Sequence, residues 1–98
     1  MSYYLLMSII FDWDSEKNKL LINSRGVSFE EVIAAIENGS VLDVLEHPNQ
    51  DKYSHQKIYV VEINSYVYLD PFVQDKNRIF LKTIIPNRKA RKKYLNNN

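Results

Sequence analysis

Four stretches rich in β-branched and aromatic residues follow one another in the second half of the chain, and they constrain the fold more than any other feature. The connections at Asn64-Ser65 and at residues 74–77 are short and polar, as β-hairpin turns are. Strands joined in this way pair antiparallel, so the pattern predicts a β-meander. Pro71 has no amide proton to donate, and we expect a bulge or an edge position there. The stretches are residues 41–46, 57–63 (KIYVVEI), 66–73 (YVYLDPFV) and 78–85 (RIFLKTII).

The first half of the chain predicts two helices. Asp14 is placed to cap the first, because a short acidic side chain accepts the unpaired amide protons of the first turn, and Gly26 supplies its left-handed end. Ser28 and Glu31 have the spacing of a capping box, and the apolar positions that follow repeat at helical intervals up to the next glycine. Residues 3–11 (YYLLMSIIF) precede these helices and favour a strand.

These elements predict an α+β fold. We expect one domain over residues 1–98, with two N-terminal helices packed on an antiparallel β-meander of three to four strands. Residues 88–95 are expected to form a short C-terminal helix or tail, and residues 96–98 to be disordered. Trp13 is expected to pack the first helix against the sheet. The aromatic residues expected in the core are Tyr59, Tyr66, Tyr68, Phe72 and Phe80.

Residues that the chain lacks exclude several classes of protein. It contains no cysteine, which excludes disulfides, zinc–thiolate sites, iron–sulfur clusters and cysteine nucleophiles. Its two glycines cannot form a phosphate-binding loop, and neither an HExxH motif nor a third ligand at a metal-binding spacing accompanies the two histidines. The apolar run over residues 3–11 is too short to cross a bilayer and has no basic leader or cleavage site. We expect a cytoplasmic protein without metal, cofactor or membrane contact.

The net charge of +1 hides a division along the chain. Residues 1–75 contain all 12 acidic residues and 5 of the 13 Lys and Arg, whereas residues 76–98 contain 8 basic residues and no acidic one. The first part therefore has a formal charge of −7 and the second of +8. A basic end on an acidic body indicates a polyanion or an acidic protein as partner. The alternative is a solvated, frayed terminus.

His47 and His55 flank a polar loop between the first two strands of the meander. Because a histidine titrates near neutral pH, one beside a phosphodiester can move a proton to or from a ribose hydroxyl. We assign His47 as the candidate general base or acid, and Lys52 in the same loop as a candidate nucleic-acid contact. The alternative is that both are ordinary loop histidines. Tyr53, in the same polar context, is a candidate for base stacking or for a phosphate-binding hydroxyl.

The last strand and the tail contain the cations best suited to phosphate. When RNA is cleaved by its own 2′-hydroxyl, charge builds on the phosphoryl oxygens, and fixed cations stabilise it without a metal. We assign Lys82 and Arg88 to this role and add the Tyr94 hydroxyl to the candidate catalytic set. Such contacts also bind any nucleic acid, so they do not by themselves indicate cleavage. The remaining candidates for RNA binding are Lys89, Arg91, Lys92 and Lys93.

Distinctive motifs stand near both ends of the chain. Residues 11–14 (FDWD) with Lys17 and Asn18, residues 25–31 (RGVSFEE), and residues 84–90 (IIPNRKA) through Tyr94 resemble the opening and closing motifs of the BrnT-like toxin family. In that family the motifs read FxWDxxKxxxN…HGvsFeea and IISARKA…Y. Here Arg25 replaces the family's histidine, and Pro86-Asn87 replaces its Ser-Ala pair, so roles of those side chains are not carried over.

The resemblance implies a branch of the RelE-type toxin superfamily, small ribonucleases that stop translation. It implies a RelE-like fold and a metal-independent endoribonuclease toxin of a type II toxin–antitoxin system. The implied partners are RNA and a DNA-binding antitoxin of the ribbon-helix-helix type, through which operon DNA is bound in a toxin–antitoxin hetero-oligomer. It assigns Arg88, Lys89 and Tyr94 to phosphate binding and transition-state stabilisation. Two alternatives stay open: a non-catalytic module that binds nucleic acid or the antitoxin, and a toxin that acts on a protein such as gyrase.

Overall fold

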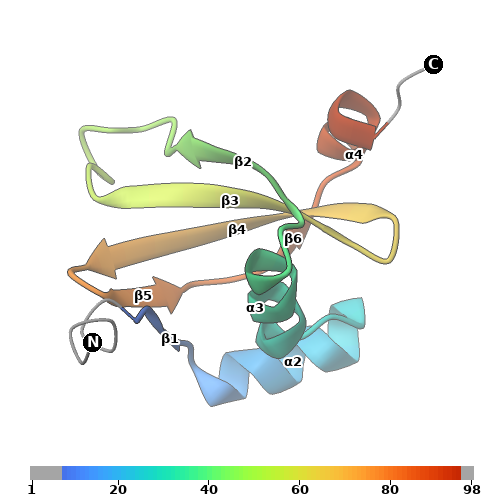
Figure 1. The fold of residues 1–98 in the computed structure, drawn as a ribbon, viewed down its shortest axis with the longest axis horizontal. Coiled ribbons are helices and arrows are strands. Elements are labelled where there is room, and N and C mark those ends of the chain that lie inside the picture. Colours follow the sequence, from blue (N-terminus) through green and yellow to red (C-terminus); the bar gives the residue numbers. More distant parts are fainter. Residues whose placement is uncertain (1–7, 96–98) are drawn as a thin grey trace.

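Within residues 8–95, the part of the chain that this computed structural model describes, six strands form one mixed sheet (Figure 1). Four of them form an antiparallel meander: β2 (Val41–Glu46), β3 (Gln56–Ile63), β4 (Tyr66–Asp75) and β5 (Arg78–Leu81). β1 (Ile10–Asp12) pairs parallel with β5, and β6 (Ile85–Pro86) pairs antiparallel with β4. The predicted α+β class and meander are therefore confirmed, and β1 makes the sheet mixed.

The β3–β4 hairpin turns at Asn64 and Ser65, as predicted. Both residues have positive φ (53° and 65°), as a type I′ turn requires, and the twist of that turn matches the twist of the flanking strands. Opposite residues then pair without a shift, from Ile63–Tyr66 at the turn to Gln56–Val73 at the far end. This register fixes which side chains of the two strands share a face.

One prediction about the strands is wrong, because the expected strand over residues 78–85 divides into β5 and the two-residue β6. Pro71 forms no bulge, since it pairs with Ile58 in an unbroken register. It lies between the ends of the β5 and β6 pairings, so β4 is partly an edge there, as predicted. The Pro71 carbonyl accepts from the Lys82 amide (2.8 Å) at the position where β5 has ended. Proline has no amide proton to donate, and Pro71 stands at the gap between β5 and β6, where no strand hydrogen bond from it is required.

The two N-terminal helices begin and end as their capping residues predict. In α2 (Ser15–Arg25) the Asp14 carboxylate accepts from two amides of the first turn, and Gly26 ends the helix with φ 68°. In α3 (Phe29–Glu37) Ser28 and Glu31 form the complete capping box. The expected strand over residues 3–11 is seen only as the start of β1, and residues 3–7 lie outside the described part.

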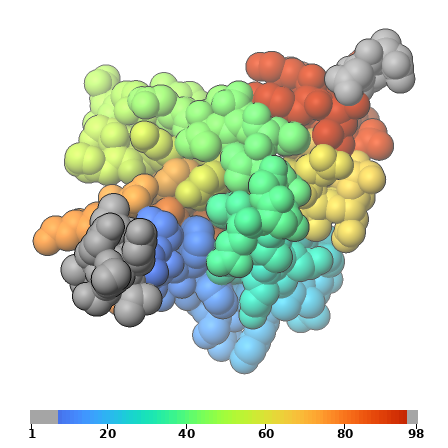
Figure 2. Space-filling view, in the orientation of Figure 1, coloured from blue at the N-terminus to red at the C-terminus, as the bar shows by residue number. Residues whose placement is uncertain are grey.

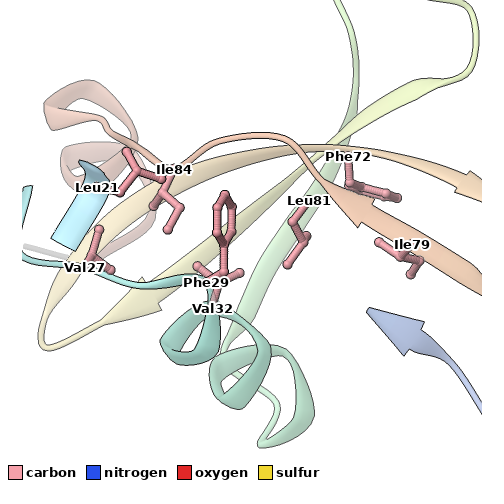
Figure 3. Close-up of a cluster of buried hydrophobic side chains, with 8 residues drawn as sticks. All are labelled: Leu21, Val27, Phe29, Val32, Phe72, Ile79, Leu81 and Ile84. Carbon is pink, nitrogen blue, oxygen red and sulfur yellow. The ribbon is translucent and has the colours of Figure 1, made fainter. Parts of the chain in front are cut away.

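The helices cover the sheet from both sides (Figure 1). α2 and α3 contribute to the main buried cluster on one face, together with side chains of β4, β5 and the segment before β6 (Figure 3). α4 (Arg88–Leu95) packs on the other face, where Ala90 joins Val60 and Val67 in a second cluster. The predicted C-terminal helix is confirmed. The main cluster consists of Leu21, Val27, Phe29, Val32, Phe72, Ile79, Leu81 and Ile84.

Of the aromatic residues expected in the core, Tyr59, Tyr68 and Phe72 belong to the main cluster or pack against it, and Tyr66 and Phe80 do not. Tyr59 stacks on Phe72 (ring centroids 4.1 Å apart), and Trp13 stacks on Phe29 at the start of α3 (6.2 Å). Phe80 was expected in the core but is 39% exposed. Because side chains of a strand alternate between faces, Phe80 points away from the side that buries its neighbours Ile79 and Leu81.

Candidate nucleic-acid interface

The basic end of the chain is a helix held against the sheet. Asn87 caps α4, because its side-chain oxygen accepts from the Ala90 amide (2.7 Å). Ala90 is 9% exposed on the sheet, and the Tyr94 hydroxyl donates to an Asp43 carboxylate oxygen of β2 (2.7 Å). Arg91 donates from Nε to the Ser65 carbonyl (3.1 Å) in the β3–β4 turn. Contacts to three strand segments therefore fix the orientation of α4.

Apart from Arg91, which bonds the Ser65 carbonyl, the cations of α4 take no part in these anchors. Arg88, Arg91 and Lys92 lie at helical positions i, i+3 and i+4, so they share one side of the helix. With Leu95 they line a hollow of about 410 Å³. The side chains of Lys89 and Lys93 are also exposed, and no acidic residue occurs in the helix. This side of α4 therefore presents a concentrated positive surface to solvent.

Tyr94 and Asp43 shift each other's protonation. The hydrogen bond from Tyr94 stabilises the ionised Asp43 carboxylate and lowers its pKa. The same hydrogen bond stabilises the protonated Tyr94 hydroxyl and raises the pKa of Tyr94. Asp43 is therefore ionised at neutral pH, and Tyr94 is a neutral donor. The Tyr94 hydroxyl, which the sequence assigned to phosphate, is engaged with a carboxylate instead.

His47 lies in the loop at the opposite end of the sheet. Its ring contacts Tyr53 (centroids 4.2 Å apart), and the Lys52 ammonium lies 5.3 Å from the centre of the same tyrosine ring. The Asn49 amide donates to Nδ1 of His47 (3.1 Å). A nitrogen that accepts cannot also carry the proton, so the neutral ring has its proton on Nε2. His47 is thereby prepared to donate through Nε2.

Lys82 reaches toward the same loop from the end of β5. Its ammonium lies 3.3 Å from the side-chain oxygen of Gln56, a residue only 8% exposed. Lys52 and Tyr53 border the same space, a hollow of about 230 Å³. Two lysines thus converge on one depression. The other lining residues are Ser54, His55 and Val73.

The loop and α4 lie at opposite ends of one sheet face (Figures 1 and 2). We call it the open face because, among residues 8–95, α4 is the one helix that packs on it. Three rows of paired residues cross it from the loop to the helix. Gln56 lies in the first row and Val60 in the third, so strand geometry separates the two ends by about 13 Å. The rows are Gln56–Val73–Phe80, Leu45–Ile58–Pro71 and Asp43–Val60–Leu69.

The structure therefore divides the predicted site residues into two groups. His47, Lys52 and Lys82 gather at the loop end, and the basic residues of α4 gather at the other. His47 and Arg88 do not share one cluster. Gln56 and Asp43 belong to this surface but were not predicted, because only strand pairing reveals their neighbours. Asn87 could have been predicted from the cap preference of asparagine before a helix.

Asp70 in β4 is a further unpredicted polar residue. It is fully buried, and among the described residues neither of its carboxylate oxygens has a hydrogen-bond partner. Burial without a partner disfavours the charge and raises the pKa of Asp70 well above its usual range. The Tyr59–Asp70 pair faces the side of α2 and α3, so Asp70 is not part of the open face.

Comparison of the chain with protein-family models, curated proteins and solved structures found no match. Within residues 8–95, no helix combines the length and the apolar character that crossing a membrane requires. In the same residues, no three histidine or acidic side chains gather where they could hold a metal ion. The candidate interface must therefore be judged from its own geometry and charge.

Proposed function

We propose that this protein is the toxin of a type II toxin–antitoxin system, a RelE-like endoribonuclease that cleaves RNA without a metal ion. The observation that carries the proposal is the docked basic helix. α4 holds five cations and no acidic residue, and the Asp43–Tyr94 hydrogen bond and buried Ala90 fix it on the sheet. A frayed tail would lose conformational entropy when it binds phosphate, and that loss weakens binding. A helix that is already ordered in the free protein avoids most of this cost.

The proposed reaction uses the RNA's own nucleophile. The 2′-hydroxyl passes its proton to water and attacks the adjacent phosphorus. The bond to the 5′ oxygen breaks, that oxygen takes a proton from water, and a 2′,3′-cyclic phosphate and a 5′-hydroxyl end form. Lys82 is proposed to stabilise charge on the phosphoryl oxygens, and Arg88, at the other end of the face, to hold a different phosphate of the same strand. His47, with its proton on Nε2, is proposed to donate a hydrogen bond to the departing 5′ oxygen as charge builds on it.

The proposed partner of α4 in the cell is a DNA-binding antitoxin. Five exposed or partly exposed cations on one helix would attract an acidic segment as strongly as they attract phosphate. Such a segment would neutralise the toxin by occupying the surface that RNA needs. A ribbon-helix-helix domain on the same antitoxin would then connect the complex to operon DNA.

A second candidate, a binding module that cuts no bond, is favoured by one observation. His47 lies beyond Gln56 at one end of the open face and α4 packs on Val60 at the other, and these two residues of β3 are about 13 Å apart along the strand. Cations at that distance hold a polyanion but do not all act on one phosphate. The loop-end group must then perform the chemistry with Lys82 as its main cation, or no cleavage occurs.

Purified protein incubated with RNA in the presence of a chelator tests the proposal. We expect fragments ending in 2′,3′-cyclic phosphate, and we expect His47→Ala and Lys82→Ala to lose turnover while keeping the melting temperature of the wild type. Lys19→Ala, on the exposed side of α2, is the matched control and should cleave normally. Intact RNA at high protein concentration would favour the binding module. Growth arrest on induction with all RNA intact would instead indicate a protein target.

A further inference from the structure

We propose that the open face is a track for single-stranded RNA with two separate phosphate subsites, one on α4 and one in the hollow between Lys52 and Lys82. This inference rests on the proposed function but concerns binding rather than cleavage. RNA is proposed to lie along the open face, with one strand reaching from the loop-end subsite to the α4 subsite.

The loop-end subsite is supported by its lining. Lys82 and Lys52 enter the hollow from different segments, and the largely buried Gln56 side chain holds the Lys82 ammonium at 3.3 Å. A lysine fixed by a hydrogen bond loses less freedom when it binds an anion. Tyr53 lies between the hollow and the ring of His47, so it connects this subsite to the hydrogen-bond donor proposed for the departing 5′ oxygen.

The surface between the two subsites suits bases rather than phosphates. Phe80 is 39% exposed and pairs with Val73, which lines the hollow. Leu45 in the next row is 37% exposed and pairs with Ile58. An exposed aromatic ring on a strand is a platform on which an unpaired base stacks, and bases of a duplex are not free to stack in this way.

The separation of the subsites sets a minimum length for the ligand. Gln56 at the loop-end subsite and Val60 beneath Ala90 are four residues apart on β3, which is about 13 Å along the strand. The α4 hollow includes Arg91, which contacts Ser65 in the turn beyond Val60, so phosphates bound at the two subsites are farther apart than this. One phosphate cannot occupy both positions, so a dinucleotide gains only one contact. A longer strand gains both, together with the stacking surface between them.

Binding of a non-cleavable 2′-O-methyl RNA, measured by fluorescence anisotropy over a series of salt concentrations, tests this inference. For a single strand of about eight nucleotides, we expect Lys82→Ala and Arg88→Ala each to weaken binding by about tenfold, as loss of one charge-assisted contact does. Each should also reduce the slope of log K against log salt by about 0.7. A dinucleotide should bind much more weakly than the longer strand.

Lys57→Ala is the matched control. Lys57 adjoins Gln56 in the sequence but faces the opposite side of the sheet, where it lines a different hollow. Equal weakening by Lys57→Ala, an unchanged salt slope in Lys82→Ala, or equal affinity for double-stranded RNA would overturn the track even if the protein cleaves RNA. Poly-glutamate that binds as tightly and shows the same loss in Lys82→Ala would assign the face to an acidic protein instead. Failure of the wild type to bind any RNA would overturn the proposed function as well.

Discussion

The Tyr94 hydroxyl donates a hydrogen bond of 2.7 Å to the Asp43 carboxylate and so joins the last helix to the edge strand β2, 51 residues earlier in the chain. This contact holds the basic helix in place, and it also puts a negative charge beside that helix. Both consequences can be measured.

Tyr94→Phe removes the hydroxyl and keeps the ring. We expect amide protons of α4 to exchange several times faster, while those of the meander stay protected, because the contact anchors one element rather than the core. Hydrogen exchange followed by mass spectrometry measures this. Uniformly faster exchange in all strands would contradict a local role.

The same contact predicts a pH window for the docking of α4. The lowered pKa of Asp43 means that its contribution is present above its unfolded value of about 4 and is lost as the pH falls through the folded value. The raised pKa of Tyr94 means that the contact is lost as the pH rises from about 10. Exchange of α4 amides, corrected for intrinsic rates, should therefore be slowest between these limits in the wild type and should not show the window in Tyr94→Phe.

Asp43→Asn removes the carboxylate charge from the open face. We expect stronger binding of single-stranded RNA, by a few-fold at low salt and less at high salt, since the change removes repulsion and no contact to RNA. Anisotropy at two salt concentrations measures the effect. Glu46→Gln removes the same charge from the same strand, but its side chain faces the other way and pairs with Lys57, so its RNA affinity should stay at the wild-type value.

Asp70 lowers the stability of the fold as the pH rises above about 4. Because its pKa is raised in the folded state, the folded protein retains a proton that the unfolded chain loses at about pH 4, and stability falls as the pH rises from there. Asp70→Asn should remove this slope and raise the free energy of unfolding at pH 8 by about 1–3 kcal/mol. Denaturant unfolding at several pH values measures both. The exposed Asp75→Asn on the same strand should leave the slope intact.

Asn18 connects the two N-terminal helices. Its side chain accepts from the Phe29 amide (2.8 Å) and donates to Glu30 (2.8 Å), which lowers the pKa of Glu30. Asn18→Ala leaves the buried Phe29 amide without a partner and should cost about 1–3 kcal/mol in the free energy of unfolding. Asn23→Ala, exposed on the same helix, should change it by less than about 0.5 kcal/mol. Equal effects of the two variants would show that the bridge contributes no stability.

The resemblance motif contains Asn18, Phe29 and Glu30, and the structure gives these positions a structural role. The Asn18 side chain joins α2 to α3 through its hydrogen bonds with the Phe29 amide and the Glu30 carboxylate, and the Phe29 ring lies in the main cluster. The three side chains lie on the side of the sheet opposite the open face, so they support the fold rather than the candidate interface.

Local interactions explain what the sequence by itself determined. Asp14, Ser28 and Gly26 act within a few residues of themselves, so the ends of the helices could be predicted from the order of the amino acids. The same is true of the Asn64-Ser65 turn and of the strands that it joins. The basic charge of the C-terminal segment is likewise a property of the sequence alone.

Only the tertiary structure decided which of these residues meet. Pairing of β1 with β5, the end of β5 at Leu81 and the exposed side of Phe80 all depend on register between segments distant in the sequence. The conformational preference of a short segment carries no information about such pairs. Bringing two distant segments together costs loop-closure entropy, which only the many contacts of the complete fold compensate. For this reason the sequence predicted one cluster of catalytic and binding residues, and the folded sheet instead holds two groups at opposite ends of one face.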